Sequence, residues 1–208
     1  MKQLRAFFPL AAVLALCLAL PACLSSQRLE TAKPAGTVLS PKLSPFVYFE
    51  DGTTLFIGVD GRAAQYIKDD EKIFPLGVGL ANQAKSSLTL SRESFVLETA
   101  SGRRLPVVSI QEFNRDYTRS PTDLRLADTF LENLATRFRN YRYVERQIFP
   151  YRGSAATATN TFELGRLFWT HLYLYFPVPE GGLHGEEFNL LVDVNESPET
   201  FVVHFKLR

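Results

Sequence analysis

The residues best suited to acid–base or metal chemistry in this chain are its histidines, which are His171, His184 and His204. Only His184 has acids close by, in the segment His184-Gly185-Glu186-Glu187, where an imidazole and a carboxylate favour a metal site or a general acid–base pair. No second ligand cluster accompanies it, so a polar hairpin loop is the preferred interpretation. We therefore expect no catalytic residue, no metal and no cofactor, and keep a hydrolase that uses His184 and Glu186 as an alternative.

Nucleophilic and soft-metal chemistry have few residues to carry them. The sequence holds no Gly-x-Ser-x-Gly elbow, and no glycine-rich loop that would cradle a phosphate. After Cys23 there is no further cysteine, and Met1 is the only methionine. A chain without residues 1–22 would thus form no disulfide and would offer no soft ligand set to a metal such as Cu(I). Its hydrophobic core must provide its stability.

A basic and aromatic segment is the strongest candidate for binding. The run Arg137-Phe138-Arg139-Asn140-Tyr141-Arg142-Tyr143 is followed by Arg146, and Arg outnumbers the acids between residues 115 and 152. The planar guanidinium group suits phosphate and carboxylate partners. The candidate interaction surface consists of Arg137, Arg139, Tyr141, Arg142, Tyr143 and Arg146. The alternative is a helix whose Phe138 and Tyr141 pack inward while its arginines are solvated.

The N-terminal segment predicts export. Lys2 and Arg5 form a short basic region, the 17 residues from Ala6 to Ala22 carry no charge, and the segment closes with Leu20-Pro21-Ala22-Cys23. This order, with the small residue Ala22 at the cleavage site, is typical of a secretory signal. The apolar run is also shorter than the roughly 20 residues of a spanning helix.

The segment Leu20-Pro21-Ala22-Cys23 resembles the lipobox of bacterial lipoproteins. The resemblance implies cleavage after Ala22, a diacylglycerol on the Cys23 thiol and an acylated new N-terminus. Each buried methylene of such chains adds roughly 0.8 kcal/mol to membrane binding, and two or more chains hold a protein firmly. Leu24 after the cysteine, where Asp would favour retention in the inner membrane, favours the outer membrane, facing the periplasm. Ordinary cleavage to a soluble exported protein and an uncleaved anchor are the alternatives.

Composition separates a tether from a folded domain. Residues 23–45 hold the lipidated cysteine and a Ser-, Pro- and Lys-rich stretch, with a reach of about 25 Å if flexible. Residues 46–208 are enough for one core. Without residues 1–22 the chain holds 21 basic and 22 acidic side chains, a net charge of −1. This balance gives no drive toward nucleic acid, so we expect no nucleic-acid partner.

From Phe46 the pattern predicts a mainly β domain. Short apolar runs separated by turns predict strands at 46–50, 54–59, 62–67, 73–82, 91–99, 105–110, 167–176, 187–194 and 200–207. The first three are joined by Asp51-Gly52 and Asp60-Gly61, which favour the positive φ of tight hairpins. Within 73–82, small residues alternate with large ones, so one face would let another layer approach closely. In the last strand Phe201, Val203, Phe205 and Leu207 alternate inward.

One helix interrupts the strands. Ser120-Pro121-Thr122-Asp123 is a helix start signal, with Pro at the first helical position. An apolar stripe follows at helical spacing, formed by Ala127, Phe130, Leu131, Leu134, Phe138 and Tyr141. These features predict a helix from about 121 to 140.

The stretch from Phe74 to Val108 resembles the immunoglobulin-like domains of exported bacterial proteins of unknown function. Its Gly-Val-Gly-Leu-Ala-Asn strand is followed by a Ser/Lys turn, by Ser-Phe-Val-Leu-Glu-Thr and by Ser-Gly-Arg-Arg. The resemblance and the spacing of turns predict one antiparallel immunoglobulin-like β-sandwich with the helix inserted.

The sequence thus predicts a lipid-anchored protein of the cell envelope with a non-catalytic binding or scaffolding role. Its expected partners are the membrane, through the N-terminal lipid, and an envelope protein or an anionic lipid or glycan. The first alternative is an accessory subunit of an envelope assembly or transport machine, docking through the aromatic strand 167–176 or the Arg-rich helix. The second is an envelope hydrolase using His184 and Glu186.

Overall fold

The computed structural model describes residues 46–68, 70–150 and 157–207, all within one compact unit that spans residues 35–208. The predicted signal segment 1–22, its cleavage site at Ala22, the lipidation site Cys23 and the tether lie outside the described residues. In the part that is described, no helix is long and apolar enough to cross a membrane.

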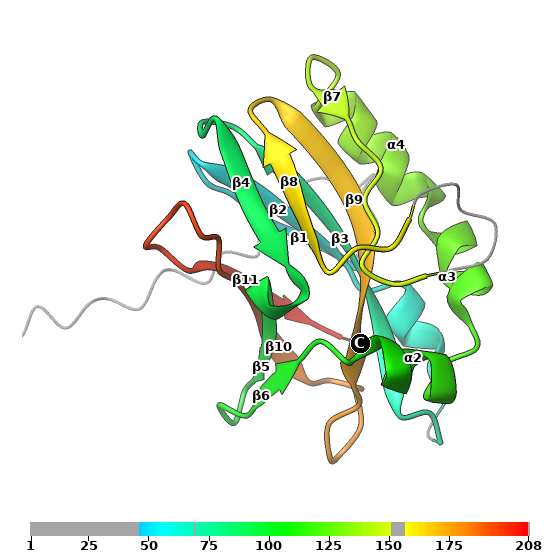
Figure 1. Ribbon diagram of the computed structural model, residues 1–208. Helices are drawn as coiled ribbons and strands as arrows, with labels where there is room; N and C mark the ends of the chain where they lie inside the picture. The colour runs from blue at the N-terminus through cyan, green and yellow to red at the C-terminus, as the bar shows by residue number, and fades with distance from the viewer. Residues whose placement is uncertain (1–45, 69, 151–156, 208) are drawn as a thin grey trace, which may run out of the picture. The chain divides into compact units, whose positions relative to one another are not determined.

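The described chain is mainly β, with antiparallel strands in three sheets (Figure 1). The strands are β1 (Val47–Asp51), β2 (Leu55–Asp60), β3 (Ile73–Asn82), β4 (Ser87–Ser91), β5 (Phe95–Thr99), β6 (Arg104–Pro106), β7 (Arg142–Tyr143), β8 (Thr161–Gly165), β9 (Phe168–Pro177), β10 (Glu187–Val192) and β11 (Phe201–Lys206). Their orders are β1-β2-β3-β9-β7, β11-β10-β5-β6 and β4-β8. Every described pair is antiparallel except β7–β9, which is parallel.

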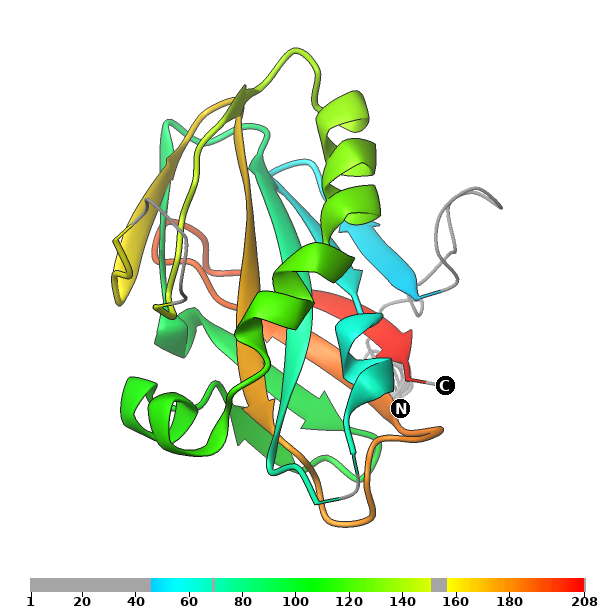
Figure 2. The ribbon, with the colours of Figure 1, turned by 90° about the vertical axis from the view of Figure 1, so that its right-hand side faces the viewer.

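Five short helical segments connect the strands. They are η1 (Ala63–Tyr66), η2 (Arg92–Ser94), α2 (Ile110–Asp116), α3 (Ser120–Leu126) and α4 (Asp128–Arg137). Figure 2 shows α3 and α4 lying across one face of the five-stranded sheet, over β3 and β9.

The main core lies between the two larger sheets. Phe74 of β3 contacts Phe188 of β10 across it, with ring centroids 6.0 Å apart. Hydrogen bonds also connect the edges of the two larger sheets. At one edge the Tyr48 hydroxyl of β1 donates to the Lys206 carbonyl of β11 at 3.0 Å. At the opposite edge the Val108 amide donates to the carbonyl of Tyr175 in β9 at 2.9 Å. Both sheets therefore depend on contacts between distant parts of the chain.

Glycines allow α4 to lie close to the sheet. A Cβ atom added at Gly79 of β3 would lie 2.5 Å from Leu134 Cδ1, and one at Gly58 of β2 would lie 3.2 Å from Phe130 Cζ. Phe130 and Leu134 are the buried side chains of α4. The prediction that small residues of strand 73–82 admit another layer is confirmed.

Most predicted strands are confirmed, but the third, at 62–67, is wrong. This segment forms the 3₁₀ helix η1, with Ala63 and Ala64 buried. The Asp60 carboxylate accepts the backbone N–H of Arg62 at 2.9 Å, which turns the chain as an Asx turn. The predicted positive φ at Gly52 and Gly61 is also wrong. At Gly52 a glycine is required for a different reason, because an added Cβ would lie only 2.9 Å from the Leu55 carbonyl oxygen.

The single helix predicted at 121–140 is wrong in extent. Its region is helical, but the helix divides at Ala127 into α3 and α4, and α4 ends at Arg137. The two pieces bury different partners, because α3 buries Asp123 while α4 buries its apolar stripe. The strand predicted at 105–110 is wrong after residue 106, because β6 ends at Pro106 and the unpredicted helix α2 begins at Ile110. Ser109 and Glu112 form a capping box at the start of α2.

The strand predicted at 91–99 is also wrong at its start. A helical turn, η2, separates β4 from β5, and β4 pairs with β8, which was not predicted. The two strands form a ribbon whose Leu88 and Phe162 are buried against the main core. In β11, Val203 and Phe205 are buried while Lys206 is exposed, which confirms the predicted alternation.

Candidate functional site

The basic and aromatic segment lies where α4 ends and β7 begins. The Phe138 amide donates to the Leu134 carbonyl at 2.8 Å, and the Tyr141 amide then donates to the Phe138 carbonyl at 2.8 Å. The chain next joins the edge of the five-stranded sheet, where Tyr143 is in register with Trp169 of β9. After Arg137, the last residue of α4, the segment is therefore a turn and an edge strand, and the helix predicted to about residue 140 ends earlier.

Arg137 connects α4 to the β1–β2 hairpin. Its guanidinium carbon lies 5.5 Å, 5.0 Å and 5.8 Å from the ring centroids of Phe49, Phe56 and Phe138. The same group forms an ion pair with Asp51. Stacking on three rings and pairing with a carboxylate occupy this cation within the fold.

Phe138 and Tyr141 belong to a second, smaller hydrophobic cluster on the outer face of the sheet. Phe138 is buried, and its ring lies 5.1 Å from that of Tyr141 and 6.4 Å from that of Trp169. Tyr141 is half-buried. Inward packing of these two rings, the alternative interpretation of the segment, is thus correct for Phe138 and partly correct for Tyr141.

The remaining predicted residues differ in exposure. Arg139, Arg142 and Tyr143 are exposed, whereas Arg146 is half-buried and donates to the Glu145 carbonyl at 3.1 Å. Tyr143 has 45% of its surface exposed and its ring lies 4.6 Å from that of Trp169. Burial of part of the ring raises the pKa of Tyr143, so its hydroxyl stays neutral.

Two turns from other parts of the chain extend this surface. The Arg166 amide donates to the Ser86 carbonyl at 3.1 Å, which joins the β8–β9 turn to the β3–β4 turn. The Arg142 amide donates to the Leu167 carbonyl at 2.9 Å, which joins the α4–β7 segment to the same turn. All three connections lie at one end of the sheet in both ribbon views (Figures 1 and 2).

Asn82 holds these turns in place. Its side-chain amide donates to the carbonyls of Lys85 and Leu164 at 2.9 Å and 2.8 Å, and its side-chain oxygen accepts the Lys85 amide at 3.1 Å. Its own carbonyl accepts the Leu167 amide at 2.8 Å. The side chain is fully buried. An Asn at the end of a strand is the only signal of this junction in the sequence.

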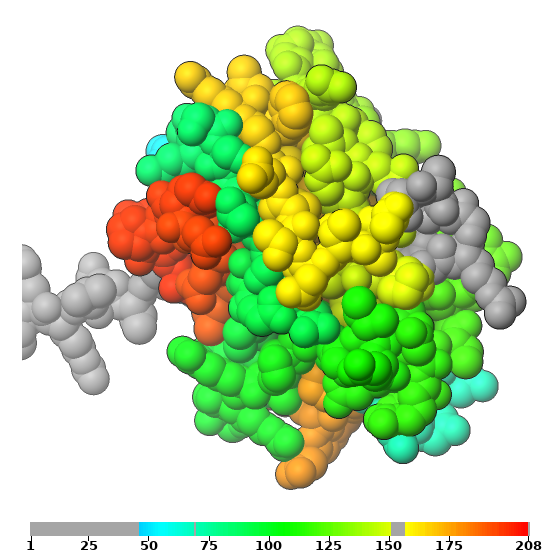
Figure 3. All heavy atoms as spheres, in the orientation of Figure 1, coloured from blue at the N-terminus to red at the C-terminus, as the bar shows by residue number. Residues whose placement is uncertain are grey.

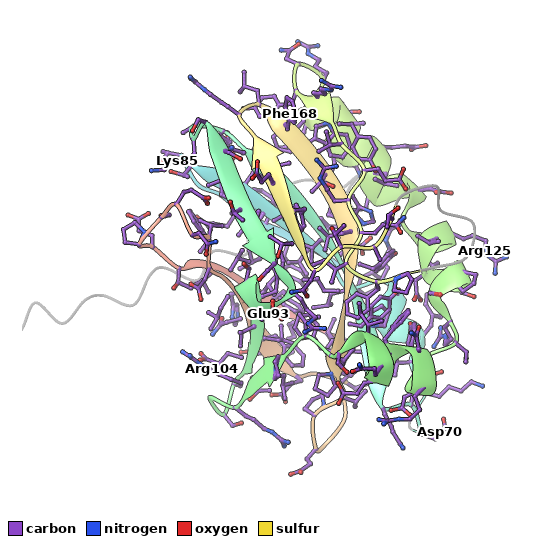
Figure 4. All side chains as sticks on the ribbon, viewed as in Figure 1. Asp70, Lys85, Glu93, Arg104, Arg125 and Phe168 are labelled. Atoms are coloured by element: carbon purple, nitrogen blue, oxygen red, sulfur yellow. The ribbon has the colours of Figure 1, made fainter. Side chains whose placement is uncertain are left out.

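We call the assembled surface the β7 tip, and its exposed residues are Lys85, Arg139, Arg142, Tyr143, Arg166 and Leu167. Figure 3 shows the β8–β9 turn and the α4–β7 segment at the upper end of the molecular face, and Figure 4 places Lys85 and Phe168 there. Arg142 lies over the Phe168 ring at 5.4 Å. The ion pairs formed among the described residues all involve other cations. Within the part of the chain that the structure describes, the tip thus presents positive charge that no ion pair neutralises, beside exposed apolar and aromatic groups.

A second polar cluster is buried beneath α3. The Tyr117 hydroxyl donates to Asp123 Oδ2 at 2.7 Å, that of Tyr175 lies 3.5 Å from the same oxygen, and that of Tyr173 donates to the Asp123 carbonyl at 2.6 Å. Asp123 Oδ1 has no described hydrogen-bond partner. Burial raises the pKa of Asp123 to about 6. The cluster anchors α3 to the sheet.

His171 is buried under α4. Its ring makes edge contacts with the rings of Phe130 and Tyr173, at 5.5 Å and 5.4 Å, and its Nε2 has no described hydrogen-bond partner. Burial, and then the positive charge of Arg62, lower the pKa of His171 to about 4. The imidazole is therefore neutral at physiological pH.

Two hollows lie away from the β7 tip. One, of about 620 Å³, lies beside α2 and α3, and its described lining is Phe113, Asn114, Tyr117, Thr118, Ser120, Pro121 and Pro150. Asp123 is not part of that lining, so the buried carboxylate does not face this hollow.

The other hollow, of about 300 Å³, includes His184. Its described lining is Ala64, Ile67, Lys68, Val178, Gly181, Gly182, Leu183 and His184, which includes no carboxylate and no serine. Within the described ranges no group of three or more His, Cys, Asp or Glu side chains could hold a metal ion. This geometry gives the hydrolase alternative no support.

The strand predicted as a docking surface at 167–176 is not available for docking beyond its first residue, the exposed Leu167. It forms β9, which lies between β3 and β7 and is buried at every position from Trp169 to Phe176. Docking through this strand, as the first alternative has it, is therefore wrong for the buried positions from Trp169 to Phe176.

Comparison with known proteins leaves the family open. No family model and no curated protein matches the chain. Among solved structures, the crystal structure of a DUF4426 family protein from Pseudomonas aeruginosa PAO1 is similar over 79% of this chain and 97% of that chain, with 9% identity and a TM-score of 0.31. A likeness of this extent assigns neither a family nor a function.

Proposed function

We propose that this protein is a lipid-anchored protein of the cell envelope, held at the outer membrane, with a non-catalytic binding or scaffolding role. The segment Leu20-Pro21-Ala22-Cys23 supports the anchor, and the β7 tip supports binding. We also propose that the two larger sheets correspond to an immunoglobulin-like sandwich, because they share one core.

The observation that supports the binding role is that Tyr143 and Arg142 are exposed and are each supported by an aromatic ring. Each lies on an aromatic ring of β9, Tyr143 on Trp169 and Arg142 on Phe168, and each is exposed. Aromatic support from below restricts the movement of both side chains, so binding an anionic partner would cost less ordering entropy. A planar guanidinium beside a phenol is suited to phosphate or carboxylate groups.

The anchor is tested by Cys23→Ser. We expect the variant to lose its lipid and to leave the membrane fraction with an unchanged circular dichroism spectrum. Membrane fractionation and mass spectrometry of the mature N-terminus measure both results. A Cys23→Ser variant that stays in the membrane fraction would contradict the anchor.

The binding surface is tested by placing a photo-crosslinking amino acid at Tyr143 in living cells. Tyr66 is the matched control, because it is also an exposed tyrosine, with 59% of its surface exposed, but lies on η1. We expect adducts from position 143 and none from position 66. Equal labelling at both positions would contradict a specific surface, and one stoichiometric protein adduct would favour the accessory-subunit alternative.

A further inference from the structure

Leu167 has a backbone conformation that its residue type does not explain. Its φ is 60°, and it is the only residue other than glycine with a positive φ in the part of the chain that the structure describes. A bulky L-residue disfavours this region, whereas glycine adopts it freely. A leucine at this position therefore serves something other than the turn.

Burial does not explain Leu167 either. Its surface is 42% exposed, so a large part of this apolar side chain remains in contact with solvent. Its backbone is nevertheless fixed on both sides, since its amide donates to the Asn82 carbonyl and its carbonyl accepts the Arg142 amide. An apolar side chain is thus held outward by a well-tied turn, and such strain points to an interaction outside the chain.

The surroundings of Leu167 combine aromatic and positive groups. Exposed Tyr143 lies on Trp169 in the neighbouring strand, and tyrosine and tryptophan favour the membrane–water interface. The surrounding cations of the β7 tip are Lys85, Arg139, Arg142 and Arg166, and none is neutralised by a described ion pair.

We propose that the β7 tip docks on an anionic lipid surface, with Leu167 and Tyr143 entering the headgroup layer and the four cations facing lipid phosphates. The proposal rests on the proposed function, because the lipid anchor would keep the domain within reach of the bilayer. A lipid surface is favoured over a protein because the exposed charged residues of the tip are all basic, and because Leu167 lies on a turn and Tyr143 on the short edge strand β7.

The chain contains a built-in probe for this test. Trp169 is the only tryptophan and lies directly under Tyr143. The full lipidated chain is reconstituted in vesicles of phosphatidylcholine alone or with added phosphatidylglycerol, each carrying brominated acyl chains that quench tryptophan at short range. We expect stronger quenching of Trp169 in the anionic vesicles, and a decrease as salt is raised.

Two variants separate charge from apolar insertion. Lys85→Gln with Arg166→Gln should lower the ratio of docked to undocked protein about fivefold for each charge removed. Leu167→Gly should also reduce quenching while its thermal midpoint stays equal or rises, because glycine relieves the strained backbone. Arg125→Gln is the matched control, since Arg125 is exposed on α3 away from the tip (Figure 4), and should leave quenching unchanged.

Equal quenching of the wild type and these variants, or equal quenching in both kinds of vesicle, would overturn the proposal. A protein adduct at position 143 combined with no lipid-dependent quenching would overturn it in favour of a protein partner. Failure of the anchor is recognised separately, because mass spectrometry of the wild-type N-terminus would then find no lipid on Cys23. A chain that is anchored but shows no charge-dependent quenching refutes only the docking of the tip.

Discussion

Two buried groups should make the pH dependence of stability a sum of opposite contributions. The pKa of Asp123 rises from 3.8 to about 6 in the folded chain. Its contribution to the free energy of unfolding is therefore complete below pH 4 and is lost as the pH rises through 6. Two pKa units correspond to about 3 kcal/mol.

His171 acts in the other direction. Its pKa falls from 6.5 to about 4 on folding, so its contribution is complete above pH 6.5 and is lost as the pH falls through 4. The magnitude is again about 3 kcal/mol. In the wild type the two contributions largely cancel between pH 4 and pH 7, and single substitutions should reveal each one.

The substitutions are Asp123→Asn, which can still accept the Tyr117 hydroxyl, and His171→Leu, of similar volume. The free energy of unfolding of Asp123→Asn, minus that of the wild type, should increase by about 3 kcal/mol as the pH rises from 4 to 7. The corresponding difference for His171→Leu should decrease by about 3 kcal/mol as the pH rises over the same range. Taking differences from the wild type removes the contribution of exposed carboxylates such as Glu112 and Glu196, whose pKa values are lowered by hydrogen bonds.

Urea denaturation at four pH values, followed by circular dichroism, measures these differences. The double variant is the control. It lacks both contributions, which largely cancel in the wild type, so its pH dependence should run parallel to that of the wild type. A difference between Asp123→Asn and the wild type that stays constant from pH 4 to pH 7 would refute the reasoning.

Three further substitutions test the packing of the domain. Gly79→Ala should lower the free energy of unfolding by about 1–3 kcal/mol, because its methyl group would meet Leu134 at 2.5 Å; an unchanged urea midpoint would mean that α4 can move outward freely. Asn82→Ala should cost about 1–3 kcal/mol by leaving buried backbone groups unpaired, and hydrogen exchange at Lys85 should accelerate. Arg137→Ala should cost about 1–2 kcal/mol in thermal unfolding through lost ring contacts, whereas exposed Arg139→Ala should cost almost nothing.

The sequence pattern predicted those elements whose structure depends on the alternation of neighbouring residues. The alternation in β3 and β11 predicted both the strands and the faces they bury, and the small residues of β3 predicted the close layer above them. The capping box of Ser109 and Glu112 was an equally local signal for α2, which the strand prediction overlooked. The division of the helix at Ala127 depends on partners from β9 and β2, so periodicity alone missed it.

The candidate site shows where sequence reasoning fails. Arg137 and Arg142 look equivalent in the chain and both are exposed, yet Arg137 pairs with Asp51 and holds α4 to the β1–β2 hairpin, whereas Arg142 forms no ion pair among the described residues. Their difference depends on which rings arrive from distant strands. Leu167 looks like the first residue of a strand, and its positive φ follows from bonds to Asn82 and Arg142. Such contacts are set by tertiary structure and leave no periodic pattern.

The tie between the first and last strands has a consequence for how the domain acquires its structure. The hydrogen bond from Tyr48 to Lys206 spans 158 positions of the chain. Strand β3 likewise pairs with β9, which follows it much later in the sequence. High contact order of this kind slows folding, since long loops must close before their contacts contribute. Strands β1 and β3 therefore lack these partners until β9 and β11 have been synthesised. During synthesis from the N-terminus, the domain can complete its folding only after β11 has left the ribosome.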